Sequence, residues 1–372
     1  MPSLTGLRWT AAFVVFAFHL HVAGILHGRT GDAARVLLGG GSAGVSFFFV
    51  LSGFVLAWSY RRRPGFHRAR FARVYPLHLV TAVVTLLVLI PYEHSAAPPR
   101  PALLANLTLT HAWVPRPEYV QSLNTVSWTL SCEALFYALL PCLMAATRRL
   151  NPTGLWLSGA AATLVVAAGP AVLTAFAGRG AATWFFHWAP PGRLPEFVAG
   201  VVLARLVATG AWRFHPPLPA AAALAAGACV LAGFTPAPYR YAAATLPAFV
   251  VLIAAAARTD RSGRGSAAAR PLTVRLGEGI GRSPSWTGLL WCVVPCRRGC
   301  AGPRDLMSAK STSRPGPTNP VKDPTSVSRR VRPRREVLIN IISVSRPRPR
   351  GRRAGRCAGR REPRSRRRPT GT

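Results

Sequence analysis

The sequence predicts an all-α membrane protein: a polytopic transmembrane helix bundle followed by a disordered basic tail. Of its 372 residues 50% are hydrophobic and only 16% are charged, and the mean hydropathy is positive at +0.23. An ordinary soluble domain of this length carries more charge and less apolar surface. Apolar segments close to the ~20 residues that cross a bilayer recur along the first three quarters of the chain, which indicates about eight spans.

Eight apolar segments are the predicted spans, and the charges between them orient the bundle. The spans are expected at residues 7–27, 43–60, 74–91, 125–147, 153–176, 194–210, 216–234 and 241–257. Most arginines of this region follow the even-numbered spans. Because cytoplasmic loops are enriched in Lys and Arg, we predict a multi-pass cell-membrane protein with a cytoplasmic N-terminus. The Pro-rich stretch 91–117 is expected to be an extracytoplasmic loop.

The charge pattern changes after Glu278. Residues 1–278 hold 23 Arg and 7 acidic residues, net +16, whereas residues 279–372 carry net +20 and are rich in Arg and Pro. A native disordered tail that contacts anionic lipid or nucleic acid would explain this change. A shifted reading frame in GC-rich coding DNA would also explain it, and we favour this second explanation. We expect no specific nucleic-acid partner, because the chain lacks an aromatic-interleaved RNA motif and zinc-finger spacing.

The first predicted span carries two ionisable residues, Arg8 and His19. Eleven residues at about 100° each make three turns plus ~20°, so both side chains share one helix face. If Arg8 lies at one interface, His19 lies ~16 Å away, near the middle of a ~30 Å hydrocarbon core. An ionisable group there is costly and suggests a function. His19 is therefore a candidate proton acceptor, and a histidine bonded to a neighbouring helix is the alternative.

Three further charged residues are candidates for a site. Glu133, in SWTLSCEALFY, lies within the fourth predicted span, where a carboxylate needs a partner or a pathway; a packing pair with an arginine is the alternative. Arg70 and Arg73 lie three residues apart near the start of the third span. That spacing places two guanidinium groups on one helix face, where they could bind phosphate. Their alternative role is the positive charge typical of cytoplasmic loops.

Other polar or small residues have simpler interpretations. Gly44 and Gly53, in GVSFFFVLSGF, allow helices to approach closely, so packing is the preferred interpretation. Arg193 and Glu196, in GRLPEFVAG at a membrane edge, could form a local ion pair or belong to a site. No metal site is predicted. The spacing of Cys292, Cys296 and Cys300, without a nearby histidine, is a weak signal.

Five motifs, taken in order, resemble acyltransferase family 3 of membrane enzymes. They are Arg8 and His19 in R-x10-H, GVSFFFVLSGF, RFARVYP with Arg70 and Arg73, SWTLSCEALFY with Glu133, and RLPEFVAG, within about residues 4–278. The resemblance implies a membrane protein, usually of ten helices, that transfers an acyl group. The acyl group is often acetyl from acetyl-CoA, and the acceptors are hydroxyls of sugars, exopolysaccharides or glycosylated natural products. The resemblance also implies that His19 is catalytic, with Arg8 as its motif partner. It further implies that Arg70 and Arg73 bind the acyl donor.

The chemistry of acyl transfer to an alcohol agrees with this resemblance. The reaction needs a base for the hydroxyl proton and an anchor for the charged coenzyme, which is a substrate and not a permanently bound cofactor. His19 would supply the base, and Glu133 could orient its imidazole or stabilise the cation. Direct attack on the donor is preferred, and an acylated histidine is the alternative.

The end of the resemblance leaves two alternatives open. After RPLTVRLGEGI, residues 270–280, the family pattern leads to an aromatic-rich segment ending in His, but GRSPSWTG follows here. Two helices are therefore expected to be missing from the acyltransferase domain. We place this domain at residues 1–278 and the tail at 279–372. An inactive truncated acyltransferase is one alternative. A proton-coupled transporter would also use intramembrane His and Glu, but it would more naturally show inverted repeats and broken helices.

Overall fold

The computed structural model describes residues 1–282 except 23–24, 26–27, 61–65, 93–96 and 264, and its described elements are all helical. Of residues 66–70, 73, 89, 92 and 280–282 it describes the backbone alone. The longer helices are α1 (Pro2–Val22), α2 (Gly28–Leu38), α3 (Gly44–Trp58), α4 (Phe66–Val84), α8 (Trp128–Arg148), α9 (Pro152–His187), α10 (Pro190–Ala208), α11 (Leu218–Phe234), α12 (Leu246–Arg261) and α13 (Pro271–Arg282). The shorter ones are η1 (Gly41–Ala43), η2 (Thr85–Leu89), α5 (Ile90–Tyr92), α6 (Arg100–Leu107), η3 (His111–Trp113), α7 (Pro117–Val120), η4 (Tyr239–Tyr241) and η5 (Ala267–Ala269).

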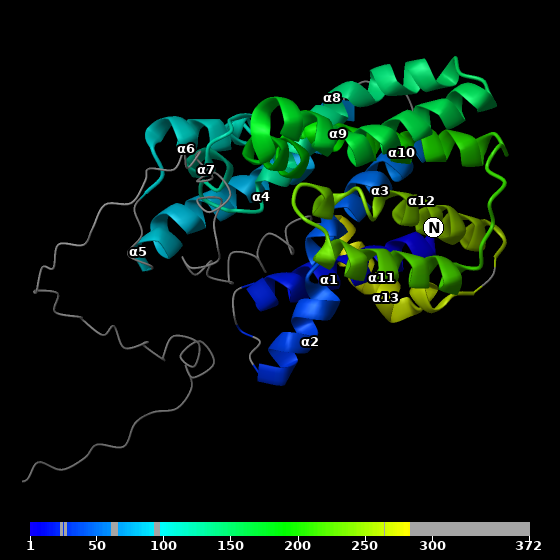
Figure 1. Cartoon of the computed structure of the whole chain (residues 1–372), viewed down its shortest axis with the longest axis horizontal. Helices are drawn as coiled ribbons and strands as arrows, with labels where there is room; N and C mark the ends of the chain where they lie inside the picture. Colours follow the sequence, from blue (N-terminus) through cyan, green and yellow to red (C-terminus); the bar gives the residue numbers. More distant parts are fainter. Residues whose placement is uncertain (23–24, 26–27, 61–65, 93–96, 264, 283–372) are drawn as a thin grey trace, which may run out of the picture. The chain divides into compact units, whose positions relative to one another are not determined.

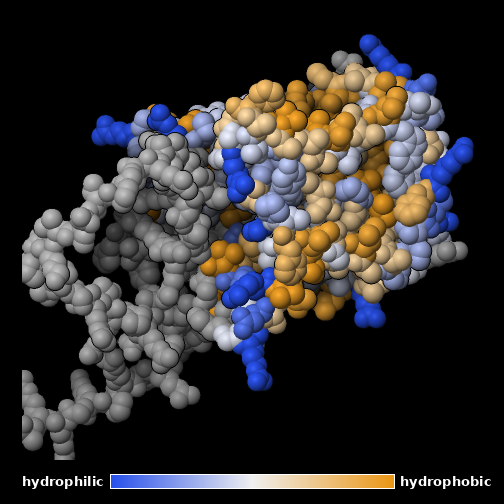
Figure 2. Space-filling model, viewed as in Figure 1, coloured by the Kyte–Doolittle hydropathy of each residue, from blue (hydrophilic) through white to orange (hydrophobic). Residues whose placement is uncertain are grey.

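The predicted all-α membrane bundle is confirmed. In the described part, five helical segments are long and apolar enough to cross a membrane: Pro2–Val22, Gly41–Trp58, Trp128–Arg148, Pro152–His187 and Tyr239–Arg261. The remaining predicted spans coincide with the shorter apolar segments Val74–Val88 and Leu218–Phe234 and with α10, which carries three charged residues. Figure 2 shows that the visible surface over the helices is mostly apolar, with strongly hydrophilic residues at its margins. That distribution is the one expected of a surface that faces lipid.

Helix α9 is longer than the predicted span at 153–176. Asn151 caps its start by accepting a hydrogen bond from the Gly154 N–H at 2.8 Å. Gly178 then adopts φ 83° and ψ 164°, a conformation open to glycine alone, and the chain bends there and resumes as a helix to His187. Helical structure therefore continues past the kink at Gly178 to His187, beyond the predicted end of the span at residue 176.

The Pro-rich stretch that was expected to be a loop is folded against the bundle from residue 97 onward. It contains α6 and η3, and buried His111 of η3 lies 3.2 Å from Ser127 Oγ and 3.4 Å from Ser131 Oγ. Burial lowers the pKa of His111 to about 4, which leaves its imidazole neutral near pH 7. Asn106 donates to Ser122 at 2.9 Å within the same network. These buried bonds fix the stretch on the start of α8.

Helix α10 forms the centre of the bundle and packs against α3, α8 and α9 (Figure 1). Where α10 crosses α3, the two backbones approach closely, and each helix contributes a glycine to the contact. A Cβ on Gly53 would collide with the carbonyl oxygen of Phe197, and a Cβ on Gly200 would collide with that of Val50. Gly44 likewise leaves room for Val15 of α1. The predicted packing role of Gly44 and Gly53 is thus confirmed.

The start of α1 is held by a residue that is distant in the sequence. Asp260, in the last turn of α12, accepts hydrogen bonds from the backbone N–H of Ser3 at 2.9 Å and of Leu4 at 3.4 Å. The first N–H groups of a helix lack partners within it, and its positive dipole end favours a carboxylate. In Figure 1 the N-terminus accordingly lies beside α12. Helix α1 therefore begins at Pro2, five residues before the predicted span.

Removal of this cap should weaken the fold. Asp260→Ala leaves the Ser3 and Leu4 N–H groups without their carboxylate, and we expect the free energy of unfolding to fall by about 1 kcal/mol. The measurement is thermal unfolding of detergent-solubilised protein. Asp32→Ala is the control, because the Asp32–Arg35 pair is exposed and such pairs contribute little. Equal stability of the Asp260 variant and the wild type would contradict the cap.

Candidate functional site

His19 lies in the last turn of α1, three residues before the helix ends at Val22. Its predicted depth in the membrane stays a prediction. Its Nδ1 lies 2.9 Å from the carbonyl oxygen of Val15. Because a carbonyl can only accept, the neutral ring carries its hydrogen on Nδ1 and its lone pair on Nε2. The helix backbone thus orients the imidazole with Nε2 as its basic atom.

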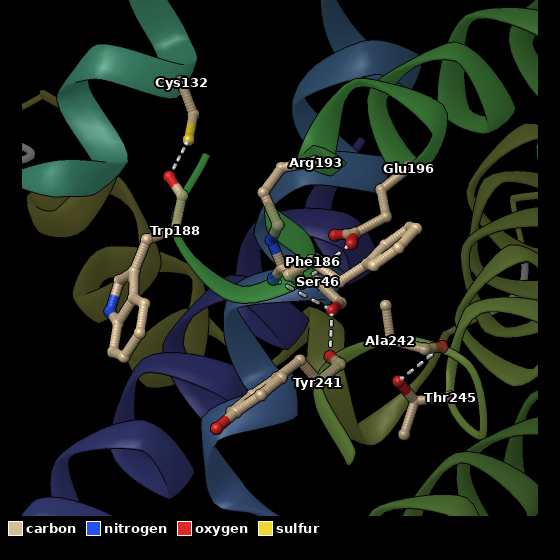
Figure 3. A network of polar contacts seen from close by, with 9 residues as sticks. All are labelled: Ser46, Cys132, Phe186, Trp188, Arg193, Glu196, Tyr241, Ala242 and Thr245. Atoms are coloured by element: carbon tan, nitrogen blue, oxygen red, sulfur yellow. Dashed lines mark hydrogen bonds and ion pairs between the residues drawn. The ribbon is translucent and has the colours of Figure 1, made fainter. Parts of the chain in front are cut away.

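A buried ion pair lies at the start of α10. Arg193 Nη1 is 2.9 Å from Glu196 Oε1, and each side chain is only 1% exposed. The guanidinium also donates to the carbonyl oxygen of Phe186 at 3.2 Å and to Ser46 Oγ at 3.3 Å. Ser46 in turn donates to the carbonyl oxygen of Tyr241 at 2.6 Å (Figure 3). One arginine therefore ties α3, α9, α10 and η4 together.

Aromatic rings enclose the same arginine. The Arg193 guanidinium carbon lies 5.2 Å from the ring centroid of Phe49 and 5.8 Å from that of Trp128. Cation–π contacts of this kind are stronger where water is excluded. Of the two interpretations left open for Arg193 and Glu196, the ion pair is observed, and both side chains point into the protein core.

A second histidine, His187, lies beside this cluster and was not singled out from the sequence. Its ring stacks between Trp188, at a centroid distance of 4.2 Å, and Tyr241, at 3.7 Å, each with an interplanar angle of 18°. The edge of Trp128 lies 5.5 Å away. A histidine among aromatic residues at a helix end, FFHW, was the available signal.

Packing of α1 explains why His19 comes close to this cluster. The helix packs against η1 and α3, where glycines at 41 and 44 admit Phe18 and Val15. Ser46 follows directly in the first turn of α3. His19, Ser46, His187 and Arg193 therefore gather at one end of the bundle, with the last turn of α1 beside the first turn of α3.

Glu133 lies on a helix that packs elsewhere. Its Oε2 accepts a hydrogen bond from the Tyr137 hydroxyl at 2.9 Å. Helix α8 packs against α10, α3 and α4, whereas α1 packs against α2, α3, α12 and α13. The hydrogen bond to Val15 sets the tautomer of His19. The catalytic role of Glu133 stays a prediction.

The other predicted residues are placed less fully. Arg8 is half-buried, is the seventh residue of α1, and lies far along the helix axis from His19. The backbone of Arg70 and Arg73 lies in α4, but their side chains lie outside the described part of the structure. Cys292, Cys296 and Cys300, and the predicted tail from residue 283 onward, also lie outside it. Among the described residues no group of His, Cys, Asp or Glu could hold a metal ion.

Comparison with known proteins points to one family. A family model described as an acyltransferase domain matches residues 1–278. Acyltransferase MdmB of Streptomyces mycarofaciens is 36% identical over 293 residues, a match that covers 75% of this chain and 76% of the relative. No solved structure matches the chain.

Proposed function

Because this chain belongs to acyltransferase family 3, we propose that it transfers an acyl group from acyl-CoA to a hydroxyl group of a carbohydrate or glycosylated acceptor. Family membership supports acyl transfer as the reaction class. The acetyl group as the preferred acyl group, the coenzyme A donor and the sugar-like acceptor are our proposal. The membrane in question would be the cell membrane, with the N-terminus in the cytoplasm.

The orientation of His19 is the observation that carries the mechanism. With Nδ1 held by Val15, Nε2 is the atom that takes the proton of the acceptor hydroxyl. The hydroxyl oxygen attacks the thioester carbonyl, the carbon–sulfur bond breaks, and an ester forms. The leaving thiolate of coenzyme A then receives the proton from His19, so that the base is restored.

Donor and acceptor would approach from opposite ends of the bundle. Arg70 and Arg73 lie in the first half of α4, the predicted span after α3, so we expect them at the end of the bundle where α3 finishes. His19 lies in the last turn of α1, beside the start of α3. The long pantetheine arm, which separates the phosphates of coenzyme A from its thioester, would extend between these two ends. We infer that the acceptor reaches His19 from the side opposite the arginines.

An assay with labelled donor tests this function. Protein purified in a detergent without hydroxyl groups is incubated with radiolabelled acetyl-CoA and a panel of glycosides. We expect label to appear in an ester that alkali hydrolyses, with release of free coenzyme A. Proton-coupled solute uptake into proteoliposomes without consumption of acetyl-CoA would instead support the transporter alternative. Absence of both activities would support an inactive acyltransferase.

The arginine pair of α4 gives a prediction for donor binding. Arg70→Ala and Arg73→Ala should each weaken acyl-CoA binding by about 1.5–3 kcal/mol, because each removes a charge-assisted contact to phosphate. Equilibrium binding to the solubilised protein measures this loss. Arg62→Ala, four residues before α4 in the sequence, is the matched control and should matter much less. If all three variants bind acyl-CoA as the wild type does, the phosphate-binding role is wrong.

A further inference from the structure

Helix α9 carries a groove whose lining is apolar throughout. The groove lies between the two arms of the helix, which meet at the bend at Gly178, and is lined by side chains within residues 164–176 and by Phe185 and Phe186. Its lining residues are all Leu, Val, Ala, Gly or Phe. Its volume of about 440 Å³ falls within the range of roughly 300–1,000 Å³ that is typical of ligand pockets. A lining without hydrogen-bonding side chains suits a hydrocarbon chain.

Packing of the two arms fixes the shape of this α9 groove. A Cβ on Gly169 of the first arm would collide with the ring of Phe186, so the missing side chain lets the second arm pack against the first. The carbonyl oxygen of Phe186 accepts a hydrogen bond from Arg193 Nη1 at 3.2 Å, which ties the second arm to α10 (Figure 3). The groove is therefore preformed, and a ligand would bind it with little reorganisation.

Helix length and the predicted topology place the groove in the outer half of the membrane. The first arm starts at Pro152, just after Arg148 and Arg149, which the charge pattern predicts to be cytoplasmic. Leu164 follows Pro152 by about 18 Å of helix, which is beyond the middle of a ~30 Å hydrocarbon core. Leu164 and Phe176 are 65% and 86% exposed, so this side of the groove is open. We expect it to open to the hydrocarbon of the extracytoplasmic leaflet, the side from which we infer that the acceptor comes.

The α9 groove adjoins the candidate site. Phe186, in its wall, accepts from Arg193, and Arg193 also donates to Ser46 Oγ at 3.3 Å. Ser46 lies in the first turn of α3, which packs beside the last turns of α1. A molecule with its chain in the groove would thus hold its head group at the end of the bundle that carries His19. This adjacency favours an acceptor over a bulk bilayer lipid as the occupant.

We propose that the α9 groove binds the hydrocarbon chain of the acceptor, while the glycosyl head group of the same molecule lies at His19. This inference rests on the proposed acyl transfer and narrows its acceptor to an amphiphile that is held in the membrane. A sugar without a hydrocarbon chain would lack this contact and would be a poorer acceptor. The groove would therefore select acceptors by their chain, and His19 would act on a hydroxyl group of the head.

Methyl glucoside and octyl glucoside test this role, because they share a head group and differ in chain length. With the protein in lipid nanodiscs and labelled acetyl-CoA as donor, we expect kcat/KM for octyl glucoside to exceed that for methyl glucoside by about tenfold or more. Val172→Trp places a large ring in the groove at a position that is 54% exposed, and it should remove most of this preference. The values for methyl glucoside and the KM for acetyl-CoA should stay unchanged.

Two further variants are the controls for filling the groove. Leu157→Trp adds the same ring at a 65% exposed position of α9 outside the groove, and it should keep the preference. Because octyl glucoside partitions equally into nanodiscs of the same lipid, a difference between the two Trp variants comes from the groove. Val172→Ala leaves the groove open and should also keep the preference. All three variants should keep the wild-type Tm, since both positions lie on the exposed surface.

Photocrosslinking provides a readout that does not require catalysis. An octyl glucoside with a diazirine at the end of its chain should label the groove, within residues 164–176 or at Phe185 and Phe186, in the wild type. Val172→Trp should reduce this labelling. A phosphatidylcholine with a diazirine at the same depth is the comparison, and it should label the lipid-facing helices without preference for the groove.

Each contrary result has a distinct meaning. Absence of transfer to either glucoside, with labelling of the groove retained, would overturn the proposed function and support the groove as a chain-binding site. Equal use of the two glucosides by an active wild type, or an unchanged preference in Val172→Trp, would overturn the inference alone. Equal labelling of the groove by phosphatidylcholine would make it a contact for bilayer lipid, and crosslinks between two copies of the chain would make it a dimer interface. Either of these results would also overturn the inference.

Discussion

We expect replacement of His19 by Ala to abolish acyl transfer and to leave the protein folded. General-base catalysis contributes about 10²–10⁴-fold to a rate, and the neutral imidazole with its lone pair on Nε2 is the group assigned to that task. The hydrogen bond from its Nδ1 to Val15 lies within α1, and Ala is a strong helix former, so α1 should keep its structure. The measurement is the initial rate of label transfer from acetyl-CoA at saturating donor.

His21→Ala is the matched control for this variant. His21 lies on the same helix two residues later, about 200° around the axis, and so points away from the face of His19. We expect it to retain transfer at close to the wild-type rate. Transfer by the His19 variant at that same rate would remove His19 from the mechanism.

Loss of Glu196 should destabilise the protein more than any other single change considered. Glu196→Ala leaves the charge of Arg193, which is 1% exposed, without its carboxylate. Breaking a buried ion pair on one side costs about 3–5 kcal/mol, because the remaining charge stays desolvated. Denaturant-induced unfolding of the solubilised protein should show this loss as a lower midpoint with an unchanged slope.

A double variant separates the ion pair from simple packing. Arg193→Met together with Glu196→Leu removes both charges and fills similar volume, so it should be markedly more stable than Glu196→Ala alone. Arg35→Ala breaks an exposed pair and should leave stability almost unchanged. If the double variant were less stable than the single one, hydrogen bonding of Arg193 to Phe186 and Ser46 would outweigh its charge pairing.

The parts of the fold that depend on local composition were predictable. Whether a segment can cross a membrane depends on the hydrophobicity of about 20 consecutive residues, and the predicted spans coincide with helices. The small residues Gly44 and Gly53 indicated close helix approach, and the pairing of Arg193 with Glu196 follows from their spacing within one helix. His19 was identified as a candidate because an ionisable side chain is rare in an apolar helix.

Features that join distant parts of the chain were decided by the tertiary structure. Asp260 caps α1 from 257 residues away, a contact that no window of sequence contains. The stack of His187 with Tyr241 likewise needs the end of α9 to meet η4. Sequence alone therefore determined the membrane bundle and the type of its reactive groups, because hydrophobicity and helical spacing are local. The positions of these groups and the residues that surround them depend on side-chain contacts that form only when the helices pack.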